Sequence, residues 1–432
     1  MYIDKVTLKN IRGFENLEFN LCRGDGKYAG WTVFTGDNGA GKSTLLKAIA
    51  VALTGRDVAR SLQPSFHRWI REGAGDQEAK IELMILPEKG VDEFSEKGNT
   101  AYKKFPATLV LKQSGKEASV ELPAASGSKA TLVQRGLWAS AARGWFSCGY
   151  GPFRRVFGAS QEATRLMVSP TTERFVTMFQ EAASLYEVDQ WLRNLSHKKL
   201  EGRSPESGQQ LDLLLELLRD ELMPNLITVD RVDSDGLWLR DRNGLQLAWS
   251  EMSDGYRAAL ALLADIVRHL IAAYGIAGLT KRGKDGKLQV VSSGVVMIDE
   301  IDAHLHPEWQ REIGFWLKRH FPNIQFLVTT HSPIICQAAD ENGLFVLPEP
   351  GSGEAPRALT TDEYKKVISS RPDTILLTPA FGLQNTRSPR AVEGRAEYAK
   401  LMAKKRAGAK LTKDEQGKAA QLEMFAVTGE EL

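Results

Sequence analysis

A nine-residue segment near the start of the chain constrains the fold more than any other feature. Residues 36–44 read GDNGAGKST, which matches the G-x-x-x-x-G-K-[ST] pattern of a phosphate-binding loop. An apolar stretch at 31–35 precedes the segment and predicts a strand, and residues 43–53 predict a helix. A strand, a glycine-rich turn and a helix in this order predict an α/β fold with a parallel sheet.

Phosphate chemistry explains the spacing within this loop. Its glycines let successive backbone N–H groups turn inward beside a helix N-terminus, whose dipole favours anions. We expect Lys42 to reach the β- and γ-phosphates of ATP and the Ser43 hydroxyl to ligate Mg²⁺. The candidate nucleotide-binding residues of the loop are Gly36, Asp37, Asn38, Gly39, Ala40, Gly41, Lys42, Ser43 and Thr44.

Two later apolar strands end in polar residues. Residues 295–298 are followed by Asp299 and Glu300, which we expect to hold the Mg²⁺ shell and to polarise the attacking water, respectively. Residues 324–328 form the other strand, and His331 just beyond it is placed to reach a γ-phosphate. Alone, each pattern also fits an ordinary strand end. Together with the phosphate-binding loop, they predict one catalytic site made of Lys42, Glu300 and His331.

A short polar segment precedes a long amphipathic helix. Residues 252–256 read MSDGY, and Ser253 and Gly255 at a helix N-terminus favour an anion. Read alone, the segment is only a helix cap followed by a glycine. In the order loop, cap, acid pair and histidine, it predicts a fourth part of the same site.

Composition argues against a polycationic nucleic-acid-binding protein, a disulfide-rich protein and a membrane-spanning protein. The 432 residues carry a net charge of +2, so any nucleic-acid contact must come from a local patch. Cys22, Cys148 and Cys336 stand far apart and build no disulfide framework. Residues 258–273 are the most apolar stretch, but charged residues interrupt them, and the N-terminus lacks a signal-peptide core. We therefore expect a cytoplasmic protein with no membrane span.

The chain is expected to have one large domain and an extension. The domain covers residues 1–340, with an antiparallel β lobe at about 79–150 and a helical lobe at about 151–225 inserted into it. Residues 341–432 form a helical, basic extension, for which a solvated helix, a docking surface for a partner protein and direct DNA binding all stay open.

The motifs resemble those of RecF/SMC-like ABC-type ATPases, and more narrowly those of the Septu- and retron-associated ATPases of bacterial anti-phage defence. PARIS and OLD-type ATPases are more distant relatives. The resemblance covers roughly residues 1–55 and 245–340. It rests on these segments: IRGF at 11–14, GDNGAGKST, MSDGYRAALALLADI, VVMIDEIDAHLHPEWQ and FPNIQFLVTTHSP.

This resemblance implies an ABC-type head in which two copies of the chain sandwich two ATP molecules. Ser253 and Gly255 of one copy would contact the γ-phosphate held by Lys42 of the other. Asp302 would lie at the seam between the copies, and Arg12 near the nucleotide.

Three departures from the family pattern narrow the expectation. Only the helical stretch 171–222 stands where SMC proteins carry long coiled coils. No glutamine is evident at the junction 149–155, where a Tyr/Arg loop, GYGPFRR, replaces the expected Q-loop. The residues after His331 show no Toprim, HNH or protease set, so we expect the chain to lack its own effector.

These observations predict an ATP- and Mg²⁺-dependent ATPase that dimerises and controls a partner effector, a nuclease encoded nearby, in phage defence. A RecF-like DNA-repair ATPase is the first alternative, and it would show a DNA-stimulated rate. A transporter nucleotide-binding subunit is the second, and it would need a membrane partner.

Overall fold

The computed structural model describes residues 1–426 apart from 75–77, 96–102, 115–116, 123–127, 141, 157–168, 203, 224–225, 350–351 and 353. Contacts within the chain divide it into two compact units, Met1–Pro372 and Asp373–Leu432. The first unit contains all the motifs of the predicted site.

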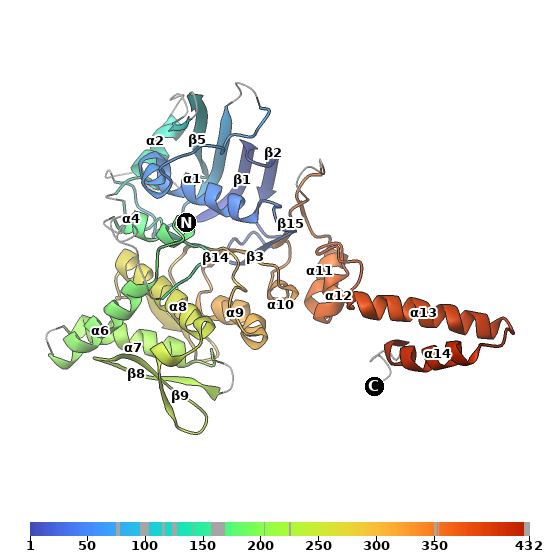
Figure 1. Cartoon of the computed structure of the whole chain (residues 1–432). Helices are drawn as coiled ribbons and strands as arrows, with labels where there is room; N and C mark the ends of the chain where they lie inside the picture. Colours follow the sequence, from blue (N-terminus) through green and yellow to red (C-terminus); the bar gives the residue numbers. More distant parts are fainter. Residues whose placement is uncertain are drawn as a thin grey trace. The chain divides into compact units, whose positions relative to one another are not determined.

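A six-stranded sheet forms the centre of the first unit (Figure 1). Its strands follow the order β16 (Arg357–Ala358), β15 (Leu344–Val346), β3 (Gly30–Thr35), β14 (Ile324–Thr329), β13 (Gly294–Ile298) and β7 (Ser147–Tyr150). All neighbours are parallel except β15 and β16. The strand after which the glycine-rich loop begins, β3, and the strand that ends at the acid pair, β13, both flank β14. The α/β fold with a parallel sheet is therefore confirmed.

A second, antiparallel sheet is built mainly from the N-terminal part of the chain. It has the order β2 (Phe14–Asn20), β1 (Tyr2–Ile11), β4 (Ala79–Leu86), β5 (Phe105–Ser114) and β6 (Glu117–Glu121). Residues of β4 alternate between buried and half-buried positions, as expected of a sheet with one face on the core.

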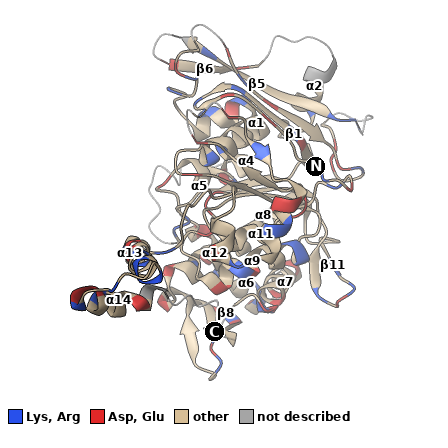
Figure 2. Ribbon diagram, turned by 90° about the vertical axis from the view of Figure 1, so that its right-hand side faces the viewer, with Lys and Arg blue, Asp and Glu red and all other residues tan. Residues whose placement is uncertain are grey.

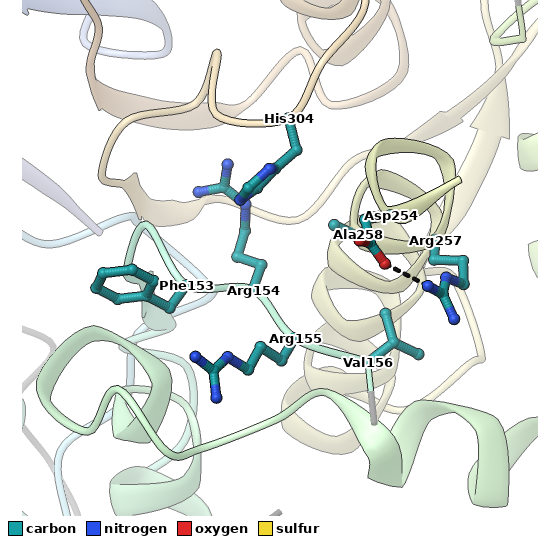
Figure 3. Close-up of a pocket in the computed structure, with 8 residues that line it drawn as sticks. All are labelled: Phe153, Arg154, Arg155, Val156, Asp254, Arg257, Ala258 and His304. Carbon is teal, nitrogen blue, oxygen red and sulfur yellow. Dashed lines mark hydrogen bonds and ion pairs between the residues drawn. The ribbon is translucent and has the colours of Figure 1, made fainter. Parts of the chain in front are cut away.

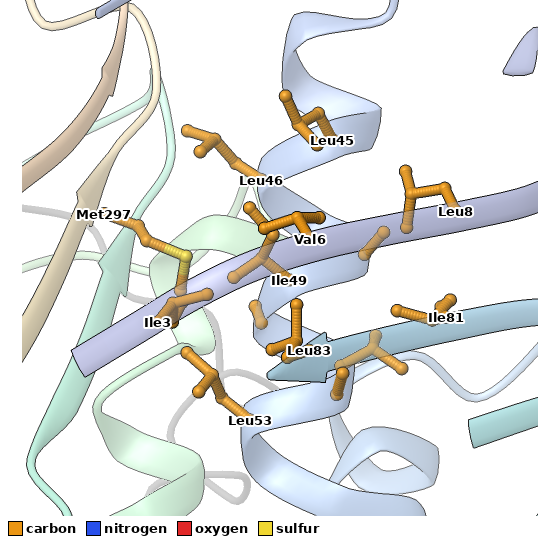
Figure 4. Close-up of a cluster of buried hydrophobic side chains, with 14 of the residues drawn as sticks. Ile3, Val6, Leu8, Leu45, Leu46, Ile49, Leu53, Ile81, Leu83 and Met297 are labelled. Atoms are coloured by element: carbon orange, nitrogen blue, oxygen red, sulfur yellow. The ribbon is translucent and has the colours of Figure 1, made fainter. Parts of the chain in front are cut away.

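Helix α1 (Lys42–Leu62) lies between the two sheets and joins their apolar faces. Figure 4 shows Leu46, Ile49 and Leu53 of this helix beside Val6 of β1 and Met297 of β13. These side chains belong to one buried cluster that includes residues of both sheets. Burial of this apolar area holds the glycine-rich loop, which leads directly into α1, on a rigid base.

The opposite face of the parallel sheet packs on helix α9 (Pro307–His320). Trp31 of β3 packs against Phe326 of β14 with ring centroids 5.5 Å apart and the ring planes tilted by 48°. A methyl group placed on Gly314 of α9 would meet the Trp31 ring at 3.2 Å, so the helix lies close to the sheet there. The short helix α10 (Pro333–Cys336) follows β14 and contacts α9.

The stretch expected to form the helical lobe precedes the long helix α8 (Asp254–Tyr274) and contains α4 (Pro170–Glu173), α5 (Val176–Phe179), α6 (Tyr186–Leu200) and α7 (Pro205–Arg219). Helix α2 (Ser128–Arg135) instead lies within the range expected for the antiparallel β lobe. The meander β8 (Thr228–Asp233), β9 (Gly236–Arg240) and β10 (Gln246–Ala248), the turn η2 (Trp249–Glu251) and the hairpin β11 (Thr280–Arg282) and β12 (Leu288–Val290) flank α8 in the sequence. Short turns at residues 234–235 and 242–243 connect the strands of the meander.

Two expectations about lobes differ from the structure. β7 was expected to belong to the antiparallel lobe, but it pairs in parallel with β13 at the edge of the central sheet. β1 and β2, which lie outside the expected lobe range of 79–150, pair with β4 in the antiparallel sheet. Strand propensity does not specify a partner, so the sequence gives the strands but not the sheet to which each belongs.

The expected boundary at residue 340 also differs. Strand β15 pairs in parallel with β3, so the central sheet continues past that residue. Helix α11 (Thr361–Ser369) contacts α10, and the Tyr364 hydroxyl donates to the carbonyl of Ala339. The second unit begins only at Asp373, within α12 (Pro372–Leu376).

The second unit contains a pair of helices, α13 (Pro389–Arg406) and α14 (Lys413–Ala426), which contact each other. Ion pairs join them at Lys404 and Glu415, and at Lys418 and Glu397. The predicted helical tail is thus two helices, because residues 407–412 interrupt it. Figure 2 shows basic and acidic residues interspersed on the pair. Among the helices of the described residues, none is long and apolar enough to cross a membrane.

Replacement of Ile49 by alanine should destabilise the first unit. Ile49 is fully buried between the two sheets, and truncation of such a side chain costs about 2–5 kcal/mol. Urea unfolding followed by far-UV circular dichroism measures the change. Leu200→Ala, at a position 82% exposed, is the control and should change the free energy of unfolding by no more than about 0.5 kcal/mol. Equal losses in both variants would contradict the layered core.

Candidate nucleotide-binding site

The glycine-rich loop leaves β3 and enters α1 with backbone conformations that suit glycine. Gly36, Gly39 and Gly41 have φ angles of 145°, 84° and 90°. A methyl group on Gly41 would meet the ring of buried Phe14 at 2.5 Å, so both conformation and space require a glycine there. The loop thus holds the first N–H groups of α1 at the edge of the sheet, where they can bind an anion.

Lys42 is the first residue of α1, and only 6% of its surface is exposed. Its Nζ donates hydrogen bonds to the carbonyl oxygens of Gly36, at 2.7 Å, and Asp37, at 2.9 Å. The ammonium therefore lies across the mouth of the loop. Burial lowers the pKa of Lys42. Four carboxylates oppose this shift: Glu300, Asp299, Asp37 and Asp302. The predicted lysine and the predicted acid pair therefore share one electrostatic environment.

Asp299 and Glu300 follow β13, and a threonine fixes both of them. The Thr329 hydroxyl, at the end of β14, donates to Asp299 Oδ1 at 2.6 Å and accepts from the Glu300 N–H at 2.7 Å. Asp299 is buried, whereas Glu300 is partly exposed. Glu300 has a φ angle of 46°, a strained conformation for a non-glycine residue. The acid pair thus sits on a turn that its neighbours must hold in place.

Arg12 lies at the wall of a cavity beside the loop. Its guanidinium donates to the Thr44 hydroxyl at 3.3 Å and stacks over the Trp69 ring, 4.9 Å from the centroid. The cavity has a volume of about 630 Å³, and Gly39, Ala40, Gly41 and Thr44 line it together with Arg12. Its other lining residues are Gly13, Phe14, Glu15, Asn16, Arg71, Pro348, Glu349, Ser352, Glu354, Ala355 and Pro356. The structure therefore places Arg12 beside the loop.

The segment at the start of α8 packs on the turn that follows the acid pair. Ser253 is exposed and is the N-cap residue of the helix, but its hydroxyl makes no capping hydrogen bond. A methyl group on Gly255 would lie 2.0 Å from the carbonyl oxygen of His304. Gly255 is thus required by contact within its own chain, a reason that the sequence analysis did not anticipate.

Asp302 and His331 lie on adjacent loops at the same edge of the sheet. The Asp302 carboxylate accepts a hydrogen bond from the Thr330 hydroxyl, and Thr330 follows β14 directly. His331 comes next in the chain and is exposed. Both predicted residues therefore border the acid turn.

The sequence analysis assigned no individual role to two residues that support this edge. Thr329 was noted only as part of the segment before His331, although its hydroxyl bridges the acid pair. Arg154, in the Tyr/Arg loop after β7, is 5% exposed and donates to the Asp299 carbonyl at 2.8 Å. Burial lowers the pKa of Arg154 to about 10, while the charges of Asp299, Asp302 and Glu300 act against it. Neither pairing can be read from the sequence, since both join residues far apart in the chain.

The residues at this edge fit a nucleotide and a divalent cation. The glycine-rich loop and Lys42 supply N–H and ammonium donors, which suit phosphate oxygens. Ser43 and Asp299 supply a hydroxyl and a carboxylate, the hard oxygen ligands that Mg²⁺ takes. Fold and site together define an ABC-type P-loop domain.

Comparisons with known proteins agree with this class. A family model described as "AAA domain, putative AbiEii toxin, Type IV TA system" matches residues 126–337, and one described as "AAA domain" matches residues 5–133. The chain is 24% identical over 389 residues to the Septu protein PtuA of Bacillus mycoides. The aligned region covers 89% of this chain and 45% of that protein. It is 21% identical to the retron Vc95 probable ATPase of Vibrio cholerae, over 80% of this chain and 74% of that one.

These matches confirm the resemblance to RecF/SMC-like ATPases of the Septu and retron type. The chain spans less than half the length of the PtuA relative, 45%. Among solved structures, the SMC head domain from Thermotoga maritima covers 84% of this chain and 100% of its own, with a TM-score of 0.45 and 15% identity.

Replacement of Lys42 by alanine should abolish ATP binding and leave the fold intact. Its ammonium is the cation that lies across the loop mouth, and charge-assisted hydrogen bonds to phosphate are strong. We would measure affinity by calorimetry and the fold by circular dichroism. Lys281→Ala, at an exposed position in β11, is the control. Unchanged ATP affinity in Lys42→Ala would refute the assignment of this site.

Replacement of Gly255 by alanine should destabilise the first unit, because the new methyl group would overlap the His304 carbonyl. Overpacking of this kind costs about 1–3 kcal/mol. Gly417→Ala in α14 is the matched control, since a methyl group there meets nothing within 4 Å. Urea unfolding compares the two, and a Gly255→Ala protein as stable as the wild type would contradict the close contact.

Proposed function

We propose that this chain binds ATP with Mg²⁺ at the loop 36–44 and hydrolyses it to ADP and phosphate. One observation carries the proposal. Buried Lys42 and the acids Asp299 and Glu300 are far apart in the sequence, yet they share one edge of the parallel sheet. The name of the V. cholerae relative, a probable ATPase, supports the same activity.

The chemistry is in-line attack of water on the γ-phosphate. N–H groups of the loop and Lys42 hold the β- and γ-phosphates, so that positioning lowers the barrier. When bound, Mg²⁺ neutralises charge on the phosphate oxygens and takes oxygen ligands from Ser43 and Asp299. Thr329 fixes the Asp299 carboxylate through Oδ1.

Glu300 and His331 act on the attacking water and on the γ-phosphate, respectively. Glu300 orients the water and accepts its proton as attack proceeds. His331, exposed beyond β14, donates a hydrogen bond to the γ-phosphate. Arg12, beside Thr44 at the cavity wall, adds positive charge near the nucleotide.

We propose further that two copies of the chain close around ATP, with Ser253 and Gly255 of each facing the loop of the other. A cavity of about 550 Å³ opens at the start of α8, between this helix and the Tyr/Arg loop (Figure 3). It is lined by Phe153, Arg154, Arg155, Val156, Asp254, Arg257, Ala258 and His304. This set shares no residue with the cavity at the glycine-rich loop, which supports completion of each site by the second copy. Asp302 then lies at the seam.

We propose that the ATP-bound dimer of this chain controls a partner effector, a nuclease, in anti-phage defence. Similarity to a Septu protein and to a retron ATPase supports this role. The second unit, with its paired helices α13 and α14, is the proposed docking site for the effector. Co-purification of the chain with the product of a neighbouring gene, lost on deletion of residues 373–432, tests the docking proposal.

A mixing experiment tests the composite site. Ser253→Arg should bind ATP but not hydrolyse it, because the bulky cation prevents closure. Lys42→Ala cannot bind ATP. A dimer of one variant with the other has one site with both lesions and one with neither, so part of the ATPase rate should return on mixing.

Glu300→Gln is the control for closure. It should bind ATP, lack hydrolysis and accumulate the closed dimer on size-exclusion chromatography, because hydrolysis normally opens the dimer. No activity at any mixing ratio, with heterodimers demonstrated by differential tagging, would contradict completion of the site in trans.

A further inference from the structure

The Tyr/Arg loop places one arginine where family resemblance leads us to expect a glutamine. The loop follows β7, whose neighbour in the sheet, β13, carries the acid pair. The buried guanidinium of Arg154 donates to the backbone carbonyls of the pair itself, of two residues after it and of Gly151 in its own loop. At Nη1 the acceptors are Gly151 (3.0 Å) and Asp299 (2.8 Å), and at Nη2 they are Glu300 (3.0 Å), Ile301 (3.4 Å) and Ala303 (3.4 Å).

The turn that receives these hydrogen bonds is strained. Glu300 has a φ angle of 46° and His304 one of 66°, and conformations of this kind cost about 1–3 kcal/mol each. Such a turn persists only where its surroundings hold it. The Thr329 hydroxyl binds the Glu300 N–H, and Arg154 binds the Glu300 carbonyl, so the peptide groups on both sides of this residue are fixed.

Arg154 is itself held firmly. The next residue, Arg155, accepts a hydrogen bond at its carbonyl from the Leu185 N–H, 2.7 Å away, and pairs with Ser184 in a β-bridge. Figure 3 shows Arg154 extending toward the loop that carries His304, whereas Arg155 points away from it. The two adjacent arginines therefore differ in what they contact.

We infer that Arg154 is a positioning residue for ATP hydrolysis, which fixes the turn of Glu300 in the geometry that water attack requires. A guanidinium has only N–H donors and cannot ligate Mg²⁺, so this residue does not replace the metal contact of a glutamine. It acts through Glu300 and does not touch the nucleotide. The inference rests on the proposed ATPase function.

Replacement of Arg154 by glutamine tests the inference in the full-length chain. This change removes the guanidinium whose two terminal nitrogens donate to the carbonyls of Asp299 and Glu300, so the turn that carries Glu300 can relax. A displacement of about 1 Å in a positioned group can cost about 10²-fold in rate, so we expect kcat to fall by about that factor. KM and the calorimetric affinity for ATP should change by less than about threefold, because binding depends on the loop around Lys42. Arg219→Gln, at the end of α7, is the matched control: it also removes a guanidinium that donates to a backbone carbonyl, that of Val229, and it should retain the wild-type kcat.

Two further variants separate positioning from other roles. Arg154→Gln combined with Glu300→Gln should be no slower than Glu300→Gln alone, because both changes act on one group. Arg154→Lys keeps a buried cation but loses the planar guanidinium with its two terminal nitrogens. This variant should fold and have a kcat between those of the wild type and Arg154→Gln. Circular dichroism and thermal midpoints check each fold.

An unchanged kcat in Arg154→Gln, additive losses in the double variant, or an ATP affinity that falls as far as the rate would overturn the inference. An Arg154→Lys protein that does not fold would overturn it in favour of a purely structural role. Absence of hydrolysis by the wild-type chain and its assembled dimer would instead refute the proposed function.

Discussion

Parallel pairing of β3, β14 and β13 is the constraint on which the rest of the site depends. Thr329 lies opposite Phe34, and Val328 lies opposite Ile298, so the three strands end together. Parallel strands present their carboxyl ends at one edge, and each of these strands therefore delivers its next residues to the same place. The glycine-rich loop, the acid pair and His331 meet there, although the 254 residues 45–298 lie between the loop and the acid pair in the sequence.

The same edge combines strained backbone with the groups that restrain it. Glu300 and His304 have positive φ angles, and the turn between them receives the guanidinium of Arg154 on one side. The backbone of Gly255 approaches the His304 carbonyl on the other side. The start of α8 is thereby in contact with the turn that bears the acid pair. A change in the position of either element would therefore alter the geometry of Glu300.

Burial and nearby carboxylates together determine the electrostatic environment of Lys42. The ammonium is almost fully removed from solvent, and the carboxylates around it compensate part of the cost. Its two carbonyl contacts hold it across the loop, where phosphate oxygens can take the same donors. A preorganised cation of this kind costs little to reorient when the nucleotide binds.

The sequence by itself determined the local parts of this protein. Apolar runs predicted β3, β13 and β14, and the loop pattern predicted Lys42 beside them, because strand and turn propensities act over a few residues. Only the tertiary structure decided which sheet received β7 and β1, and that the central sheet passes residue 340 through β15. It alone brought Arg154 and Thr329 onto the acid turn, and showed why Gly255 must be a glycine. The physical reason is that such contacts depend on the pairing of distant segments, which the sequence pattern of neither segment encodes.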